Sequence, residues 1–234
     1  METKMIHLTI DNIPVTVPEG TTVLEAARSA GIKIPSLCYL KDINEIGACR
    51  ICVVEVKGAR SLMASCVYPV SEGMEVRTNT ERVRHSRRLT LELILSNHRM
   101  DCLTCPRNAQ CELRQLAADM GIDAVRYAND NLLPQPEETA LHLVRDNSKC
   151  ILCRRCVSAC HKLQSVGVIG PNDRGFHTHI GCAFDRDLAE VDCVSCGQCI
   201  VACPTGALAE KDSTAEVLAA LHDPTKHVVV GPAP

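Results

Sequence analysis

Apolar and polar residues alternate in two short runs near the start of the chain, IHLTI and IPVTV, which are separated by Asp11 and Asn12. Alternation with a period of two predicts β-strands, and polar turn residues between two such runs predict a hairpin. The segment from Lys4 to Val17 is therefore predicted to form a β-hairpin. The sequence PEG at 18–20 interrupts the pattern and ends the second strand.

Capping residues and apolar periodicity predict helices farther along the chain. Thr21 or Thr22 can cap a helix that continues through VLEAARSA to the glycine that follows. The sequence TNTE at 78–81 has the form of a capping box and predicts a helix of about five turns toward Asn97. A further helix is expected to carry CELRQLAADM, and the runs ICVVEV and SLMASC predict two more strands.

The order of these elements predicts an α+β fold class. Hairpin, helix and return strands suit a small mixed sheet wrapped on one helix, with the cysteine-bearing loops at one end of the sheet. A stretch that contains Pro134 and Pro136 is expected to be a connecting strap, and two copies of one cysteine run predict a pseudo-twofold module. The expected boundaries are 1–78 for the sheet domain, 79–121 for a helical domain, 122–139 for the strap, 140–212 for the repeated module and 213–234 for a tail with one amphipathic helix.

Fifteen of the sixteen cysteines, together with one histidine, fall into four runs with ligand-like spacing. The runs are Cys38, Cys49, Cys52 and Cys66 (C-x10-C-x2-C-x13-C); His98, Cys102, Cys105 and Cys111 (H-x3-C-x2-C-x5-C); Cys150, Cys153, Cys156 and Cys160; and Cys193, Cys196, Cys199 and Cys203 (the last two both C-x2-C-x2-C-x3-C). Thiolates at this spacing ligate iron–sulfur clusters, which store and pass single electrons. The four runs could hold one two-iron and three four-iron clusters. The alternative is zinc, whose tetrahedral sites use the same C-x2-C pairs.

The two matching runs predict a crossed arrangement of ligands. In two-cluster modules with this spacing, the fourth cysteine of each run ligates the other cluster. The expected sets are therefore Cys150, Cys153, Cys156 and Cys203, called the third set below, and Cys193, Cys196, Cys199 and Cys160, called the fourth set. A proline follows Cys203, as this pattern expects, whereas His161 follows Cys160.

Composition and charge narrow the function classes. Aromatic residues make up only 2% of the chain, so metal ligation is expected to support a fold that lacks large core-filling side chains. The N-terminus has no signal-peptide pattern, and no apolar stretch approaches the roughly 20 residues of a membrane span. Reduced cysteines and metal sites then predict a cytoplasmic protein with no direct membrane insertion. The net charge of −3 argues against a general nucleic-acid binder.

Three segments resemble, in order, the iron–sulfur region of a known family. LCYLKDINEIGACRICVVEV with Cys66 resembles the plant-type two-iron domain of the large iron–sulfur subunit of NADH dehydrogenase and of iron-only hydrogenases. HRMDCLTCPRNAQCELRQLA resembles the next element of those families, which holds a four-iron cluster with one histidine ligand, here His98. DCVSCGQCIVACPTGAL is similar to their two-cluster ferredoxin segment, and the resemblance covers about residues 4 to 212.

The resemblance implies a fold and a set of cofactors. We expect a β-grasp 2Fe-2S domain, a small helical 4Fe-4S domain with His98 as a ligand, and a bacterial-type domain with two 4Fe-4S clusters. The cofactors are then one 2Fe-2S and three 4Fe-4S clusters. One imidazole in place of a thiolate removes a negative charge and is expected to raise the potential of its cluster.

The sequence shows no dinucleotide, flavin or substrate motif and no catalytic centre of its own, so electrons are expected to enter and leave through other proteins. The leading hypothesis is an electron-transfer subunit between a flavin subunit that oxidises NAD(P)H and a catalytic subunit of hydrogenase or formate dehydrogenase type. Such complexes include electron-bifurcating ones, and soluble ferredoxin is a further candidate partner.

Two alternatives remain open. The tail HVVVGPAP resembles the opening of the catalytic domain of iron-only hydrogenases, so the chain could be the relay region of such an enzyme without its catalytic domain. A free ferredoxin-like carrier is the other alternative.

Several other residues receive a plainer interpretation. Cys182 matches no ligand position and is expected to be an ordinary cysteine, and His177 and His179 are expected to form an exposed loop pair. The basic run from Arg82 to Arg88 is interpreted as a solvated helix face, with a docking patch for an acidic partner as the alternative.

Overall fold

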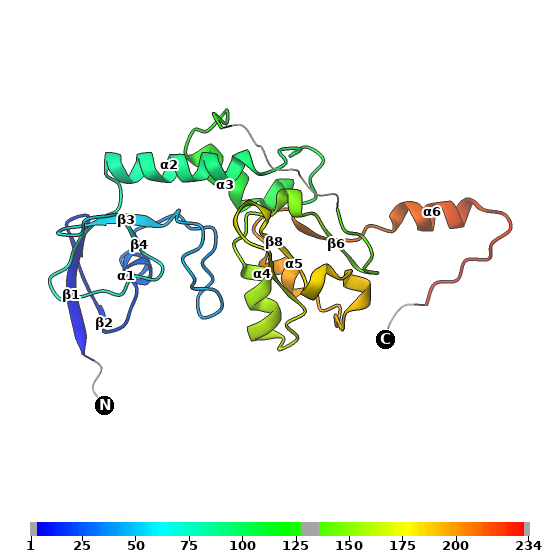
Figure 1. Ribbon diagram of the computed structural model, residues 1–234, viewed down its shortest axis with the longest axis horizontal. Helices are drawn as coiled ribbons and strands as arrows, with labels where there is room; N and C mark the ends of the chain where they lie inside the picture. Colours follow the sequence, from blue (N-terminus) through cyan, green and yellow to red (C-terminus); the bar gives the residue numbers. More distant parts are fainter. Residues whose placement is uncertain (1–3, 128–135, 232–234) are drawn as a thin grey trace.

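The computed structural model describes residues 4–127 and 136–231. Figure 1 shows a sheet body at one end, a second body of loops and short elements in the middle, and helix α6 (Thr214–His222) at the far end. Residues 128–135 of the strap predicted over 122–139 lie outside the described residues, as do 1–3 and 232–234. Mixed α/β architecture is confirmed.

The sheet body is built on a five-stranded sheet with the order β2-β1-β5-β3-β4. Its strands are β1 (Met5–Ile10), β2 (Ile13–Pro18), β3 (Val53–Val56), β4 (Met63–Ala64) and β5 (Glu75–Arg77). The predicted hairpin is confirmed, because β1 and β2 pair antiparallel up to Ile10 opposite Ile13. Asp11 and Asn12 have φ of 50° and 68°, as a two-residue hairpin turn requires. β5 pairs parallel with β1 and was not predicted.

Helix α1 (Val23–Ser29) packs its apolar side into the core of this body. Thr22 caps the helix, since its hydroxyl accepts a hydrogen bond from the Glu25 N–H at 3.3 Å, which confirms one of the two predicted caps. The core consists of buried aliphatic residues from the hairpin, α1 and the later strands. It contains one buried aromatic side chain, Tyr39.

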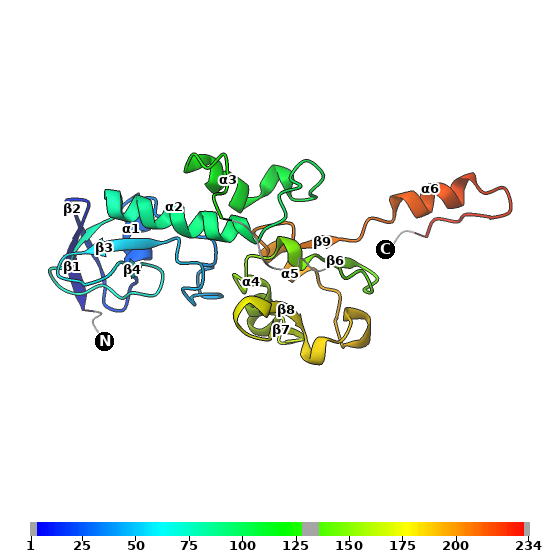
Figure 2. The ribbon, with the colours of Figure 1, turned by 45° about the horizontal axis from the view of Figure 1, so that its top comes forward.

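Helix α2 (Glu81–Ser96) leads from the sheet body to the second body, as Figure 2 also shows. The helix is confirmed, but its cap is Thr80, whose hydroxyl accepts from the Val83 N–H, and not Thr78. The Thr78 hydroxyl and N–H are instead hydrogen-bonded to the Asp11 carboxylate. This long-range contact removes Thr78 from the capping role.

The basic run on α2 is only partly a solvated face. Arg87 is buried and donates to the Val53 carbonyl at 2.7 Å, which fixes α2 against β3. Arg82 lies 3.6 Å from Glu55, and Arg88 lies 3.2 Å from the buried Glu92. The helix therefore uses several of its basic side chains within the protein.

The second body contains short paired strands and short helices. Strand β6 (Leu143–Arg145) pairs antiparallel with β9 (Leu208–Glu210), and β7 (Ile169–Asn172) pairs with β8 (His179–Cys182). Helix α3 (Glu112–Asp119) shares an apolar cluster with α2. Helices α4 (Arg155–Ser158) and α5 (Gln198–Ala202) each begin within a cysteine run. The remaining helical turns are η1 (Asn108–Gln110), η2 (Asn147–Lys149), η3 (Ala159–Leu163), η4 (Gly175–His177), η5 (Ala183–Asp185) and η6 (Leu188–Glu190).

A shared apolar cluster joins the two bodies. It combines residues of the first cysteine loop, of α2 and α3, and of the second body, including Leu37, Ile51, Leu91, Leu113 and Cys153. Burial of such side chains stabilises the contact by roughly 25 cal/mol for each Å² of apolar surface. The cluster therefore holds the first and third ligand runs close together.

Candidate metal centres

The first set, Cys38, Cys49, Cys52 and Cys66, is gathered at one end of the β3–β4 pair. Cys52 directly precedes β3, and Ser65 binds the Cys52 carbonyl through its hydroxyl at 2.7 Å and its N–H at 3.2 Å. Cys66 follows Ser65 at the same end. All four side chains are buried, and the Cys38 thiol lies within hydrogen-bonding reach of Cys49 and Cys66.

The close spacing of these buried thiols indicates a site that needs a cation. A hydrogen bond to Cys38 and burial raise the pKa of Cys49, and hydrogen bonds to Cys38 and Cys52 raise the pKa of Cys66. Buried thiolates this close together repel one another unless positive charge compensates them. A donor set of four thiols therefore fits an iron group that is ligated by thiolates.

The third and fourth sets each line one cavity, and each cavity takes cysteines from both runs. One cavity is lined by Cys150, Cys153, Cys156 and Cys203. The other is lined by Cys160, Cys193, Cys196 and Cys199. Burial raises the pKa of Cys150 to about 11 and that of Cys153 to about 12, so these thiols also require a compensating cation to ionise at neutral pH.

The backbone has the same unusual conformation in both runs. Leu152 and Arg154 have positive φ of 53° and 60°, and the equivalent positions, Ser195 and Gly197, have φ of 57° and 71°. Residues in this left-handed region turn the chain sharply, and here they bring successive cysteines to the same cavity. The Leu152 N–H also points to the Cys150 sulfur, at 3.4 Å. The two runs are thus local structural repeats.

The cysteines of the second set lie on the loop between α2 and α3. Cys111 caps α3, with its sulfur 3.4 Å from the Arg114 backbone nitrogen. Burial raises the pKa of the Cys111 thiol, and the nearby Cys105 and Cys102 raise it further. Gly206 packs directly against this loop, because a Cβ on Gly206 would lie 2.4 Å from the Cys105 sulfur. The chain after Cys203 therefore passes immediately beside the second set.

His98 lies just beyond the end of α2, next to Lys149 of the second body. Its Nδ1 atom is buried and has no hydrogen-bond partner among the described residues. Burial, and then the positive charge of Lys149, lower the pKa of His98, which favours the neutral imidazole that metals bind. An unsatisfied ring nitrogen in a neutral ring fits the predicted ligand role.

Asn44 connects the first and third sets, and nothing in the sequence pattern predicted it. Its side chain is fully buried and donates to the Cys38 carbonyl at 2.7 Å and to the Cys153 carbonyl at 3.0 Å. It also accepts from the Ser158 hydroxyl at 2.7 Å. The Asn44 amide therefore donates through its nitrogen and accepts through its oxygen, and it joins the two bodies at the loops of the first and third sets.

We expect Asn44→Ala to loosen this junction, because it leaves two carbonyls and a hydroxyl unpaired in a buried place. Such a loss costs about 1–3 kcal/mol. Hydrogen–deuterium exchange of the intact iron-loaded protein should show faster exchange in segments 37–46 and 152–158. Asn79→Ala, which changes an exposed asparagine, is the control. Unchanged exchange in both segments would show that the apolar cluster alone holds the junction.

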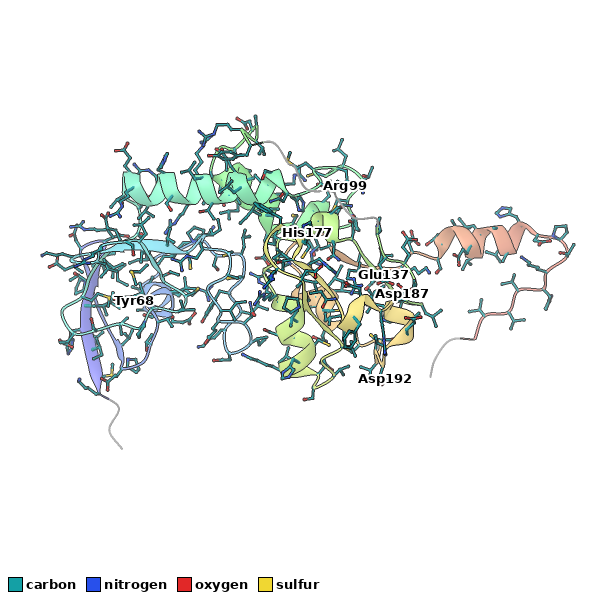
Figure 3. All side chains as sticks on the ribbon, in the orientation of Figure 1. Tyr68, Arg99, Glu137, His177, Asp187 and Asp192 are labelled. Atoms are coloured by element: carbon teal, nitrogen blue, oxygen red, sulfur yellow. The ribbon has the colours of Figure 1, made fainter. Side chains whose placement is uncertain are left out.

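The remaining candidates have ordinary surroundings. Cys182 is buried on β8, where its sulfur is 3.8 Å from an Arg145 nitrogen. His177 is exposed and labelled in Figure 3, whereas His179 is partly buried and its Nε2 lies 2.7 Å from Asp185. Within residues 4–127 and 136–231, no group of three or more His, Cys, Asp or Glu side chains is arranged to hold a single metal ion. No helix in these described segments is long and apolar enough to cross a membrane.

Comparison with known families matches three consecutive parts of the chain. A 2Fe-2S iron-sulfur cluster binding domain matches residues 3–81, the NADH-ubiquinone oxidoreductase-G iron-sulfur binding region matches residues 87–126, and a 4Fe-4S dicluster domain matches residues 149–207. Two-iron and four-iron domains in this order agree with the resemblance drawn from the sequence.

Similar curated proteins are much longer than this chain. NADP-reducing hydrogenase subunit HndD of Solidesulfovibrio fructosivorans is 43% identical over 99% of the chain, which spans 40% of that relative. An NADH-quinone oxidoreductase subunit of Rhizobium meliloti is 34% identical over 87% of the chain, and NADPH-Fe(3+) oxidoreductase subunit alpha of Geobacter sulfurreducens is 36% identical over 88%. The chain spans 24% of each of these two relatives.

A solved structure decides the family. In the crystal structure of NAD+-reducing NiFe hydrogenase in the H2-reduced state, one chain matches with a TM-score of 0.82 and 30% identity, over 88% of this chain and 87% of that chain. The chain belongs to the family of iron–sulfur subunits of NADH dehydrogenases and NAD(P)-linked hydrogenases. The kinship that the sequence predicted is thereby confirmed. The presence of two-iron and four-iron domains is confirmed with it.

Proposed function

We propose that the chain relays electrons between a flavin subunit that oxidises NAD(P)H and a second catalytic subunit, of hydrogenase or formate dehydrogenase type, in a multi-subunit oxidoreductase. The names of the relatives support a role in NAD(P)-linked complexes. The proposed cofactors are one 2Fe-2S cluster in the first set and one 4Fe-4S cluster in each of the other three sets. When bound, these clusters accept and release single electrons at potentials that the protein adjusts.

The central position of the third set carries this proposal. Asn44 joins Cys153 of the third set to Cys38 of the first set. The segment after Cys203 packs on Cys105 of the second set, and the Pro204 carbonyl accepts from the Glu112 N–H at 3.0 Å. The cavity of the fourth set shares lining residues with that of the third set. Each outer set thus lies against the third set, as a branched relay requires.

The surroundings of the fourth set suit electron exit to a partner. Cys196 is exposed, and the nearby Val194 and Val201 are 62% and 71% exposed. Exposed apolar side chains around a ligand loop favour contact with another protein. The cysteines of the first set are buried by contrast, so their loops exclude water from that site.

The first test is anaerobic purification of the chain from its native host, with identification of co-purifying subunits and iron analysis of the same sample. We expect stable flavin and catalytic subunits and about 14 iron atoms per chain, the content of four clusters of these types. A solitary protein with the same iron would instead indicate a free carrier. Zinc in place of iron would refute the relay.

A second candidate is the relay region of a longer chain that carries its own catalytic domain. The observation in its favour is that 99% of this chain matches only 40% of the HndD subunit. The mass of the polypeptide in the same native preparation distinguishes the two candidates, because a longer polypeptide would retain these 234 residues at one end.

A further inference from the structure

A buried arginine lies between the cavities of the third and fourth sets. Arg145 ends strand β6, and its side chain lines both cavities. Ile169 and Leu208 are the other residues that line both, so Arg145 supplies the charge that the two cavities share. Its relative exposure is 8%. The position is set by the β6–β9 pair, where Arg145 is in register with Leu208.

The partners of Arg145 leave much of its guanidinium uncompensated. One terminal nitrogen lies 3.5 Å from the Glu137 carboxylate, and the other lies 3.8 Å from the Cys182 sulfur. The Nε atom is buried without a hydrogen-bond partner in the described part of the chain. Glu137, labelled in Figure 3, is held beside Arg145 by two backbone hydrogen bonds of 2.8 and 2.9 Å.

The charge of this side chain is permanent, and its burial is unfavourable without nearby negative charge. Arginine keeps its proton at any physiological pH. Among the described residues, Glu137 forms the one ion pair of Arg145, and Asp185 acts on it only at longer range. Arg145 therefore lacks the close pairing that normally offsets the desolvation of a buried cation. The cysteines of the two adjacent cavities supply negative charge when they ligate iron. Arg145 lines both cavities and so faces both groups of cysteines.

We infer that the guanidinium charge of Arg145 sets the reduction potentials of the third-set and fourth-set clusters jointly. This inference rests on the ligation proposed above. Reduction adds one electron to a cluster. No proton is transferred, and no bond is formed or broken. The added negative charge is favoured by the nearby guanidinium, which stabilises the reduced form at both sites. In the working protein the electron comes from the other ligand sites, and in a titration it comes from dithionite.

Redox titration followed by electron paramagnetic resonance on the whole iron-loaded chain tests the inference. Arg145→Gln is expected to lower both reduction potentials by at least 59 mV, which is a tenfold change in the equilibrium constant for adding one electron. Arg145→Lys keeps the charge and is expected to shift both by less than half as much. Arg174→Gln removes an exposed arginine of the same module and is expected to shift neither.

A second variant keeps the test decisive if Arg145→Gln loses iron. Glu137→Gln removes the counter-charge and leaves Arg145 in place, so both potentials are expected to rise. The first and second sets lie outside these two cavities, and their signals serve as internal references. Full iron content with a shift at only one cluster, or at neither, would overturn the joint role. Absence of the four-iron signals from the unmodified protein would refute the proposed ligation itself.

Discussion

Replacing Cys203 by alanine is expected to abolish the cluster ligated by Cys150, Cys153 and Cys156, although Cys203 belongs to the other cysteine run. The reason is geometric, because these four side chains line one cavity. Alanine leaves no donor at the fourth corner. Iron content should fall by about 4 atoms per chain, the content of one four-iron cluster. Iron and sulfide analysis with paramagnetic resonance of the reduced protein would measure this loss.

The reciprocal variant identifies which signal is lost. Cys160→Ala should remove the cluster of Cys193, Cys196 and Cys199, and its spectrum should differ from that of Cys203→Ala. Cys182→Ser is the matched control, since it changes a buried cysteine of the same body that lies in neither cavity lining. If Cys203→Ala instead lost the same signal as Cys193→Ala, each run would hold its own cluster and the crossed assignment would be wrong.

Elements set by local sequence were predictable. The hairpin follows from strict alternation around a polar pair, and Asp11 and Asn12 tolerate the positive φ that its turn needs. The cap at Thr22 is a contact over three residues. The two matching cysteine runs predicted a repeat, and both runs have positive φ at equivalent positions. Each of these features depends on residues close together in the chain.

Features that depend on distant contacts were missed. Strand β5 has one apolar residue in EVR, and its place in the sheet comes from parallel pairing with β1. The cap of α2 is Thr80 and not the predicted Thr78, because Thr78 is hydrogen-bonded to the Asp11 carboxylate. Asn44 lies in a loop whose composition looks polar and solvated, yet it binds Cys153 at a separation of 109 residues. Spacing therefore indicated the candidate ligands and did not indicate the residues that link them.

His98→Cys is expected to preserve the second-set cluster and to lower its reduction potential by on the order of 100 mV, because a thiolate adds the negative charge that an imidazole lacks. His98→Ala is expected to lose iron from this site alone. The position favours ligation, since the Nδ1 atom of His98 is buried and unpartnered and the ring is held neutral beside Lys149. Redox titration of the whole iron-loaded chain measures the potential.

A second readout separates a ligand from a neighbour. A coordinated imidazole couples its nitrogen nucleus to the electron spin of the reduced cluster, so nitrogen hyperfine coupling should be present in the unmodified protein and absent from His98→Cys. His85→Cys, at an exposed position of α2, should keep both the coupling and the potential. If the coupling persisted in His98→Cys, another residue would be the ligand. The potential of the second-set cluster would then be set by its surroundings. The raised potential that the sequence predicts could no longer be explained by an imidazole ligand.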